Sequence, residues 1–126
     1  GAAGQAQHLG ECRTEAGAIG QSLSVEQRRR LETDLLQLYH SELNGNGAQI
    51  TSEDLKVDYR WGLLGALSIP MVAVQGIEDA QPGENAGEEE IAQFSAMMDA
   101  GRALQGVIAE RAVTAVMDND CASVLS

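Results

Sequence analysis

The segment WGLLGALSIPMVAV, residues 61–74, contains no charged side chain and is the longest apolar stretch of the chain. A transmembrane helix needs about 20 such residues, and Gly62, Gly65 and Pro70 interrupt this one. We therefore expect a buried helix rather than a membrane span. Because Pro70 lacks a backbone N–H and clashes with the carbonyl four residues earlier, the helix should kink near Ile69.

Helix-start signals lie on both sides of this segment. Ser24 and Gln27 form a capping-box pattern, Thr51 or Ser52 can cap a second helix, and the acidic run that begins at Glu88 suits the start of a third. Apolar residues then recur at three- and four-residue steps, and no alternating strand pattern competes with them. The sequence predicts an all-α fold: an irregular or weakly helical segment over residues 1–23, then a helical unit over residues 24–126 with long helices near 24–44, 52–75 and 88–117.

Charge and cysteine usage restrict the classes of partner. The chain has 19 acidic and 8 basic residues and a formal net charge of -11, which repels phosphate backbones and anionic membranes. We therefore expect neither nucleic acid nor a membrane as partner, and a cytoplasmic location, because no signal-peptide pattern is present. Cys12 and Cys121 lack CxxC spacing, so we predict two free thiols and no metal site.

No pattern in the sequence predicts catalysis. His40 has no nucleophile at helical spacing, and the consecutive carboxylates of residues 88–90 point in different directions around a helix. The run Asp118-Asn119-Asp120 begins like a calcium loop but lacks the later ligands. We expect the basic residues 28–30 to pair with neighbouring carboxylates, so the sequence predicts no catalytic, cofactor-binding or metal-binding residue.

The run Asp58-Tyr59-Arg60-Trp61 places polar and aromatic side chains in an otherwise apolar helix. Tyrosine and tryptophan offer flat apolar faces with one polar group each, and arginine binds anionic groups. Lining of a substrate pocket is one interpretation of these four residues. Packing of the rings, with a local ion pair between Arg60 and Asp58 or Asp54, is the other.

Several of these patterns carry a family likeness. They are the run Gly20-Gln21-Ser22-Leu23-Ser24 before a helix, the stretch from Leu35 to Tyr39-His40, the run Asp58-Tyr59-Arg60-Trp61-Gly62-Leu63, and the ending from Arg111 to Ala122. Over about residues 16–126 the chain resembles the C-terminal helical segment of the aminoglycoside phosphotransferase and ecdysteroid-kinase-like group, which has a choline-kinase-like fold.

The resemblance implies part of a two-lobed, ATP-dependent small-molecule kinase in which the Tyr59-Arg60 helix borders the acceptor-substrate pocket. The family's His-Gly-Asp catalytic loop and its following metal-binding Asp lie upstream of these helices and have no counterpart here. ATP and Mg²⁺ are thus implied only for the complete enzyme, and no cofactor for this chain. The implied partners are a separate catalytic core or, through exposed apolar helix faces, other copies of the chain. A stand-alone, non-enzymatic helical interaction module is the alternative.

Overall fold

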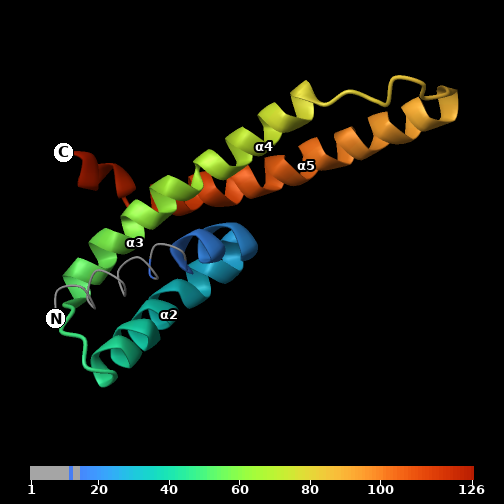
Figure 1. Cartoon of the computed structure of the whole chain (residues 1–126). Coiled ribbons are helices and arrows are strands. Elements are labelled where there is room, and N and C mark those ends of the chain that lie inside the picture. Colours follow the sequence, from blue (N-terminus) through green and yellow to red (C-terminus); the bar gives the residue numbers. More distant parts are fainter. Residues whose placement is uncertain (1–11, 13–14) are drawn as a thin grey trace.

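A computed structural model describes residue 12 and residues 15–126, and every regular element in this part of the chain is helical (Figure 1). The all-α prediction is confirmed over these residues. Of the segment predicted to be irregular or weakly helical, residues 1–11 and 13–14 lie outside the described residues, and residues 15–22 are helical. The elements that follow are α2 (Val25–Gly45), α3 (Ser52–Ala66), α4 (Ser68–Asp79), α5 (Glu88–Asp118) and the 3-10 helix η1 (Cys121–Leu125).

The predicted caps are present. Ser24 Oγ accepts a hydrogen bond from the Gln27 backbone N–H at 3.2 Å, and the Gln27 side chain accepts one from the Ser24 backbone N–H at 3.1 Å. Thr51 Oγ1 accepts from the Asp54 backbone N–H at 3.1 Å. Each of these bonds satisfies a donor that the first turn of a helix leaves without an internal partner, which is why α2 and α3 begin where the sequence predicts.

The long second helix of the prediction is two helices, α3 and α4, joined at Leu67. The interruption falls just before Pro70, because Pro70 cannot donate to the carbonyl of Ala66. Gln21 Nε2 donates to that carbonyl instead, at 3.1 Å. Leu67 keeps right-handed helical backbone angles, so α4 continues in nearly the direction of α3, and the predicted kink is a short break.

The helices α4 and α5 form an antiparallel hairpin that extends away from α2 (Figure 1). Their less exposed residues recur at alternating four- and three-residue steps, the spacing of a coiled coil. At the centre, a Cβ on Gly101 would lie 3.2 Å from Ile77 Cδ1, so the two backbones approach closely there. The less exposed residues of this inner side are Pro70, Ala73 and Ile77 on α4, with Ala66 before it and Ala80 after it, and Phe94, Met98, Gly101, Gln105, Ile108, Ala112 and Ala115 on α5.

The hydrophobic core lies at the base of this hairpin, where α2, α3, η1 and the end of α5 meet. It is built mainly from aliphatic side chains and one ring. Cys12 and Cys121, predicted as thiols outside any metal site, are both buried in it, and no disulfide joins them. Its other buried members are Ala16, Leu43, Ile50, Leu55, Tyr59, Leu63 and Ala115.

The prediction that residues 61–74 form a buried helix is wrong for their second half. Ile69 is 53% exposed and Val72 is 71% exposed, because α5 covers only one side of α4 and α2 does not reach it (Figure 1). By length and composition, Ser52–Asp79 would also suffice to cross a membrane. One segment of this kind is a weak indication, because core helices of soluble proteins meet the same criterion.

We predict that a side chain at Gly20 is harmful and that one at Gly106 is not. A Cβ on Gly20 would lie 2.9 Å from Cδ2 of the buried Leu63, so Gly20→Val should lower the free energy of unfolding by about 1–3 kcal/mol through overpacking. A Cβ on Gly106 meets nothing within 4 Å, and Gly106→Val should leave stability equal or slightly higher. Urea unfolding followed by circular dichroism measures both; equal destabilisation would contradict the close packing at Gly20.

Candidate functional site

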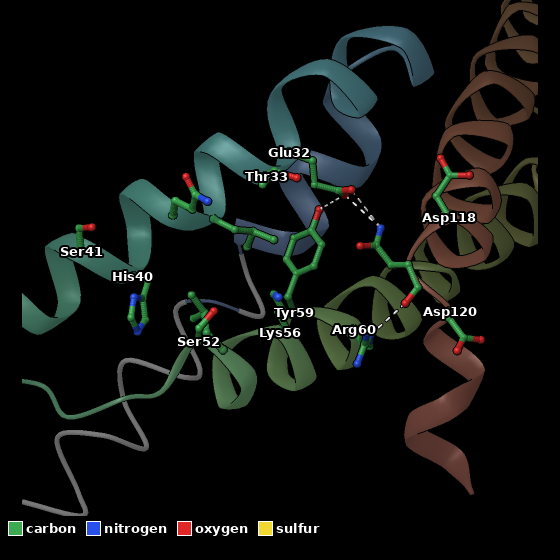
Figure 2. A pocket seen from close by; sticks show the side chains of 14 residues that line it. Glu32, Thr33, His40, Ser41, Ser52, Lys56, Tyr59, Arg60, Asp118 and Asp120 are labelled. Carbon is green, nitrogen blue, oxygen red and sulfur yellow. Dashed lines mark hydrogen bonds between the residues drawn. The ribbon is translucent and has the colours of Figure 1, made fainter.

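A groove of about 610 Å³ opens between α2, α3 and the residues that follow α5 (Figure 2). Both acidic and basic side chains reach it. Three elements that are far apart in the sequence contribute to it. Its polar lining consists of Glu32, Thr33, Gln37, His40, Ser41, Ser52, Lys56, Tyr59, Arg60, Asp118, Asn119 and Asp120.

Glu32 is the centre of the hydrogen-bond network at one end of the groove. Its carboxylate accepts from Tyr59 Oη at 2.5 Å, from Asn119 Nδ2 at 3.1 Å and from Arg28 Nη1 at 3.2 Å. Figure 2 shows the Tyr59 hydroxyl pointing toward this carboxylate. These donors come from α3, from the end of α5 and from α2 itself, so one carboxylate connects three helices.

Arg28 extends this network to Asp118. The Arg28 side chain is 1% exposed, and its Nη2 lies 2.5 Å from Asp118 Oδ2. Arg29 binds the same carboxylate with two nitrogens, Nε at 2.7 Å and Nη2 at 3.2 Å. A buried guanidinium is tolerated only when it is paired and hydrogen-bonded, and Arg28 meets this condition with Glu32 and Asp118.

The network changes the proton affinities of its members. Hydrogen bonds from Arg29 and Arg28 lower the pKa of Asp118 to about 2. Burial, and then the hydrogen bond to Glu32, raise the pKa of Tyr59 far above its ordinary range. Burial also raises the pKa of Cys121 to about 11. At neutral pH Asp118 is therefore a charged and very weak base, while Tyr59 and Cys121 stay protonated.

Three further polar residues of the groove have partners within the chain. Arg60 Nε donates to the backbone carbonyl of Asn119 at 2.9 Å, which attaches the end of α5 to α3. His40 Nε2 lies 2.7 Å from the backbone carbonyl of Ile50, so this ring braces the turn after α2. Lys56 Nζ lies 3.6 Å from Glu53 Oε1 in an exposed pair.

The four residues predicted to line a substrate pocket do not share one surface. Tyr59 and Arg60 line the groove. Asp58 is buried, with 3% exposure. Trp61 lies on another side of α3, in a shallow hollow beside Gly17 and Ile69. Of the two interpretations of Arg60, pairing with Asp58 or Asp54 is replaced by its bond to the carbonyl of Asn119.

Two carboxylates of the groove, Glu32 and Asp118, bind the arginines of α2, and the sequence predicted only part of this. Residues 28–30 were expected to pair with neighbouring carboxylates, and the bond from Arg28 to Glu32 fits this expectation. The bonds of Arg28 and Arg29 to Asp118 do not, because about 90 residues separate the partners. An arginine cluster in an otherwise acidic chain was the only signal available for such a long-range pair.

This arrangement favours structure and binding over catalysis. Each carboxylate of the network already accepts hydrogen bonds from arginine, tyrosine or asparagine, so neither is poised to take a proton. Within the described residues, no three His, Cys, Asp or Glu side chains gather closely enough to hold a metal ion.

The chain matches no protein-family model, no curated protein and no solved structure.

We predict that Arg28→Ala lowers the free energy of unfolding by about 3 kcal/mol or more, because it leaves the carboxylates of Glu32 and Asp118 without their buried partner. Arg30→Ala is the matched control, since Arg30 is exposed in the same turn and its loss should change stability by less than about 0.5 kcal/mol. Chemical unfolding of both variants measures the difference. Similar values for the two would show that the buried network does not hold the helices together.

We also predict an acid-sensitive contribution from Asp118. Its folded-state pKa of about 2 lies below the ordinary 3.8, so its stabilisation is present above about pH 4 and is lost as the pH falls toward 2. Asp118→Asn should therefore be less stable than the natural chain near neutral pH, with the gap closing in acid. Thermal unfolding across this range tests it, with the exposed Asp34→Asn as control; a gap that persists at pH 2 would contradict the assignment.

Proposed function

We propose that this chain is a non-enzymatic helical interaction module that binds its partner through one side of the α4–α5 hairpin. We call this side the apolar flank. Leu104 at its centre is 57% exposed, and Val72 on the facing helix is 71% exposed. No member carries a charge. The apolar flank consists of Ile69, Val72 and Gly76 on α4 and Met97, Ala100, Leu104 and Val107 on α5.

Contacts at the base of the hairpin locate the apolar flank. Arg111 lies four residues after Val107 and seven after Leu104, so it is on the same side of α5. Its Nη1 donates to the backbone carbonyl of Gln21 at 3.1 Å. Gln21 also borders the hollow that contains Ile69 of α4. The same flank of both helices therefore meets the helix of residues 15–22 at the base and is uncovered beyond it.

The opposite flank of the hairpin is charged. Arg102 Nε donates to Glu78 at 2.8 Å, and Arg102 Nη1 donates to Asp99 at 2.9 Å. These residues bridge α4 and α5 where water can reach them. The opposite flank therefore mixes these charges with the exposed side chains of Met71 and Val74, whereas the apolar flank carries no charge, as is typical of an interface core.

The proposal is supported by this uncharged side of a projecting pair of helices, on which Val72 and Leu104 are largely exposed. Contiguous exposed apolar patches larger than a few hundred Å² mark interaction sites in soluble proteins. The hydrophobic core, at the base, gives this surface no cover. In the groove, the carboxylates of Glu32 and Asp118 are already engaged in hydrogen bonds with arginine, tyrosine and asparagine.

A role as the C-terminal part of an ATP-dependent phosphotransferase is the second candidate. Its support is that Tyr59 and Arg60, which the family resemblance places beside the acceptor-substrate pocket, both line the groove. In that case the catalytic core would cover the apolar flank, and ATP and Mg²⁺ would bind the core. The chain alone should then show no Mg²⁺-dependent ATP turnover; a rate that Glu32→Gln abolishes would contradict both candidates.

We predict that the isolated chain either self-associates or binds a hydrophobic dye such as anilinonaphthalene sulfonate, and that Leu104→Glu reduces whichever is seen by at least about tenfold. Leu38→Glu is the matched control, because Leu38 is 60% exposed on α2, away from the apolar flank. Sedimentation velocity and dye titration measure the two properties, and circular dichroism checks folding. A dye-silent monomer, or an equal effect of Leu38→Glu, would overturn the proposed function.

A further inference from the structure

The proposed interaction module leaves the chemistry of its partner open, and the following inference deepens that proposal and rests on it. We infer that the partner protein presents a basic amphipathic helix, which lies along the uncovered part of the apolar flank. The apolar face of this helix contacts the side chains around Leu104. Lysine or arginine residues at the edges of that face pair with carboxylates that border the flank.

Three exposed carboxylates border the apolar flank. Asp79 on α4 and Glu90 on α5 each lie seven residues from a member of the flank, Val72 and Met97 respectively, so each is on the flank's side of its helix. Glu110 lies three residues after the last flank residue of α5, at the outer edge of that helix. The uncharged surface therefore has acidic borders at its base and toward its tip.

These carboxylates keep their charge without a cation beside it. Gln75 Nε2 donates to Asp79 Oδ1 at 3.0 Å, but a side-chain amide is neutral and leaves the charge uncompensated. In the part of the chain that the structure describes, no lysine or arginine forms an ion pair with Asp79, Glu90 or Glu110. A partner can therefore supply the missing positive charge.

The hairpin has no basic side chain to spare. Between residues 67 and 118 the basic residues are Arg102 and Arg111 alone. Arg102 is paired with two carboxylates on the opposite flank. Arg111 donates to backbone carbonyls at the end of the helix of residues 15–22. Charge complementarity along the apolar flank thus points to a basic partner.

The three carboxylates are spread over the length of the flank. Gly101 lies against Ile77, so in the antiparallel hairpin Asp79 is level with a point two residues before Gly101 on α5. At about 1.5 Å per residue, Glu110, Asp79 and Glu90 then follow one another at steps of about 15 Å. A helix of about 20 residues can meet all three, with basic residues at intervals of about ten.

This placement leaves the chain's own contacts intact. The helix of residues 15–22 covers the base of the flank, where Arg111 donates to the carbonyl of Gln21. Beyond this cover, Ile69 and Leu104 are exposed, and the flank is open toward the tip. The partner's helix would begin where the internal cover ends and would continue the same kind of helix packing along the hairpin.

Charge disfavours the other occupants of this surface. A second copy would bring the same uncompensated carboxylates to the interface, and an anionic membrane would be repelled by them. A neutral helix would partly remove these carboxylates from water without giving them a partner, which costs free energy. A basic helix converts the same charges into attraction and faster association.

Two designed peptides of about 20 residues test the inference by fluorescence anisotropy on the whole chain. Both carry leucines at three- and four-residue steps; one has lysines at the edges of the leucine face and the other has glutamines there. The lysine peptide should bind at least about fivefold more tightly, and added salt should remove most of the difference. Equal affinities, or tighter binding of the glutamine peptide, would overturn the basic partner.

Uncharged substitutions show whether the peptide lies on the apolar flank. Leu104→Gln leaves the net charge unchanged and should weaken binding of the lysine peptide at least about tenfold, because it removes a central apolar contact. Leu38→Gln is the matched control on α2 and should have no effect. Circular dichroism checks that both variants fold. Equal effects of the two substitutions would overturn the assigned surface.

Paired substitutions separate the bordering carboxylates from the general negative charge. Asp79→Asn with Glu110→Gln should weaken binding of the lysine peptide about three- to tenfold and leave the glutamine peptide unaffected. Asp34→Asn with Glu42→Gln removes the same two charges from exposed positions of α2 and should have little effect. Equal losses would mean that the overall charge attracts the lysines and would overturn the inference.

The outcomes also separate the inference from the proposed function. Dye binding that Leu104→Glu abolishes, without preference for the lysine peptide, would overturn the basic partner and leave the interaction module standing. A natural dimer that Leu104→Glu dissociates would do the same, because a second copy would then occupy the flank. A monomer that binds neither dye nor peptide would overturn both.

Discussion

The burial of Arg28 is the constraint on which the arrangement of helices depends. A guanidinium out of contact with water needs nearby carboxylates, because the cost of removing its charge from water is otherwise several kcal/mol. The two that serve it are Glu32, one turn away on α2, and Asp118, at the end of α5. Tyr59 then donates to Glu32 from α3. One buried cation thus fixes the relative positions of α2, α3 and α5.

With its end fixed in this way, α5 must extend beyond the core. It has 31 residues, against 21 in α2 and 15 in α3, so its first half contacts only α4. A two-helix hairpin can bury the side where its helices touch but leaves both outer flanks in water. The exposed apolar residues around Leu104 follow from this geometry, and so does the exposure of Val72.

The molecule therefore has two regions of different character. The groove at the base is polar, and its carboxylates Glu32 and Asp118 are bonded to the arginines of α2, which stabilises the fold and makes Asp118 a weak base. The apolar flank of the hairpin contributes nothing to the core and has no internal partner that would account for its composition. Association is the physical process that gives such a surface a favourable environment, and the uncompensated carboxylates that border it favour a basic partner.

The sequence by itself determined the helices and their starts, because caps are local. Ser24 with Gln27 and Thr51 with Asp54 act over three residues, and the carboxylates from Glu88 favour a helix start wherever that turn lies. Pro70 likewise disturbs its helix through the carbonyl of Ala66, four residues away. These features require no knowledge of the rest of the fold.

The tertiary structure decided what each helix face meets. It paired Arg28 with Asp118, placed Tyr59 and Arg60 in the groove, turned Trp61 to another side of α3, and left Val72 in water. Apolar periodicity marks which face of a helix avoids water, but not whether a neighbour exists to cover it. That depends on helix lengths and on contacts between residues far apart in the chain, and here one such contact, between α2 and the end of α5, decided both the groove and the exposed flank.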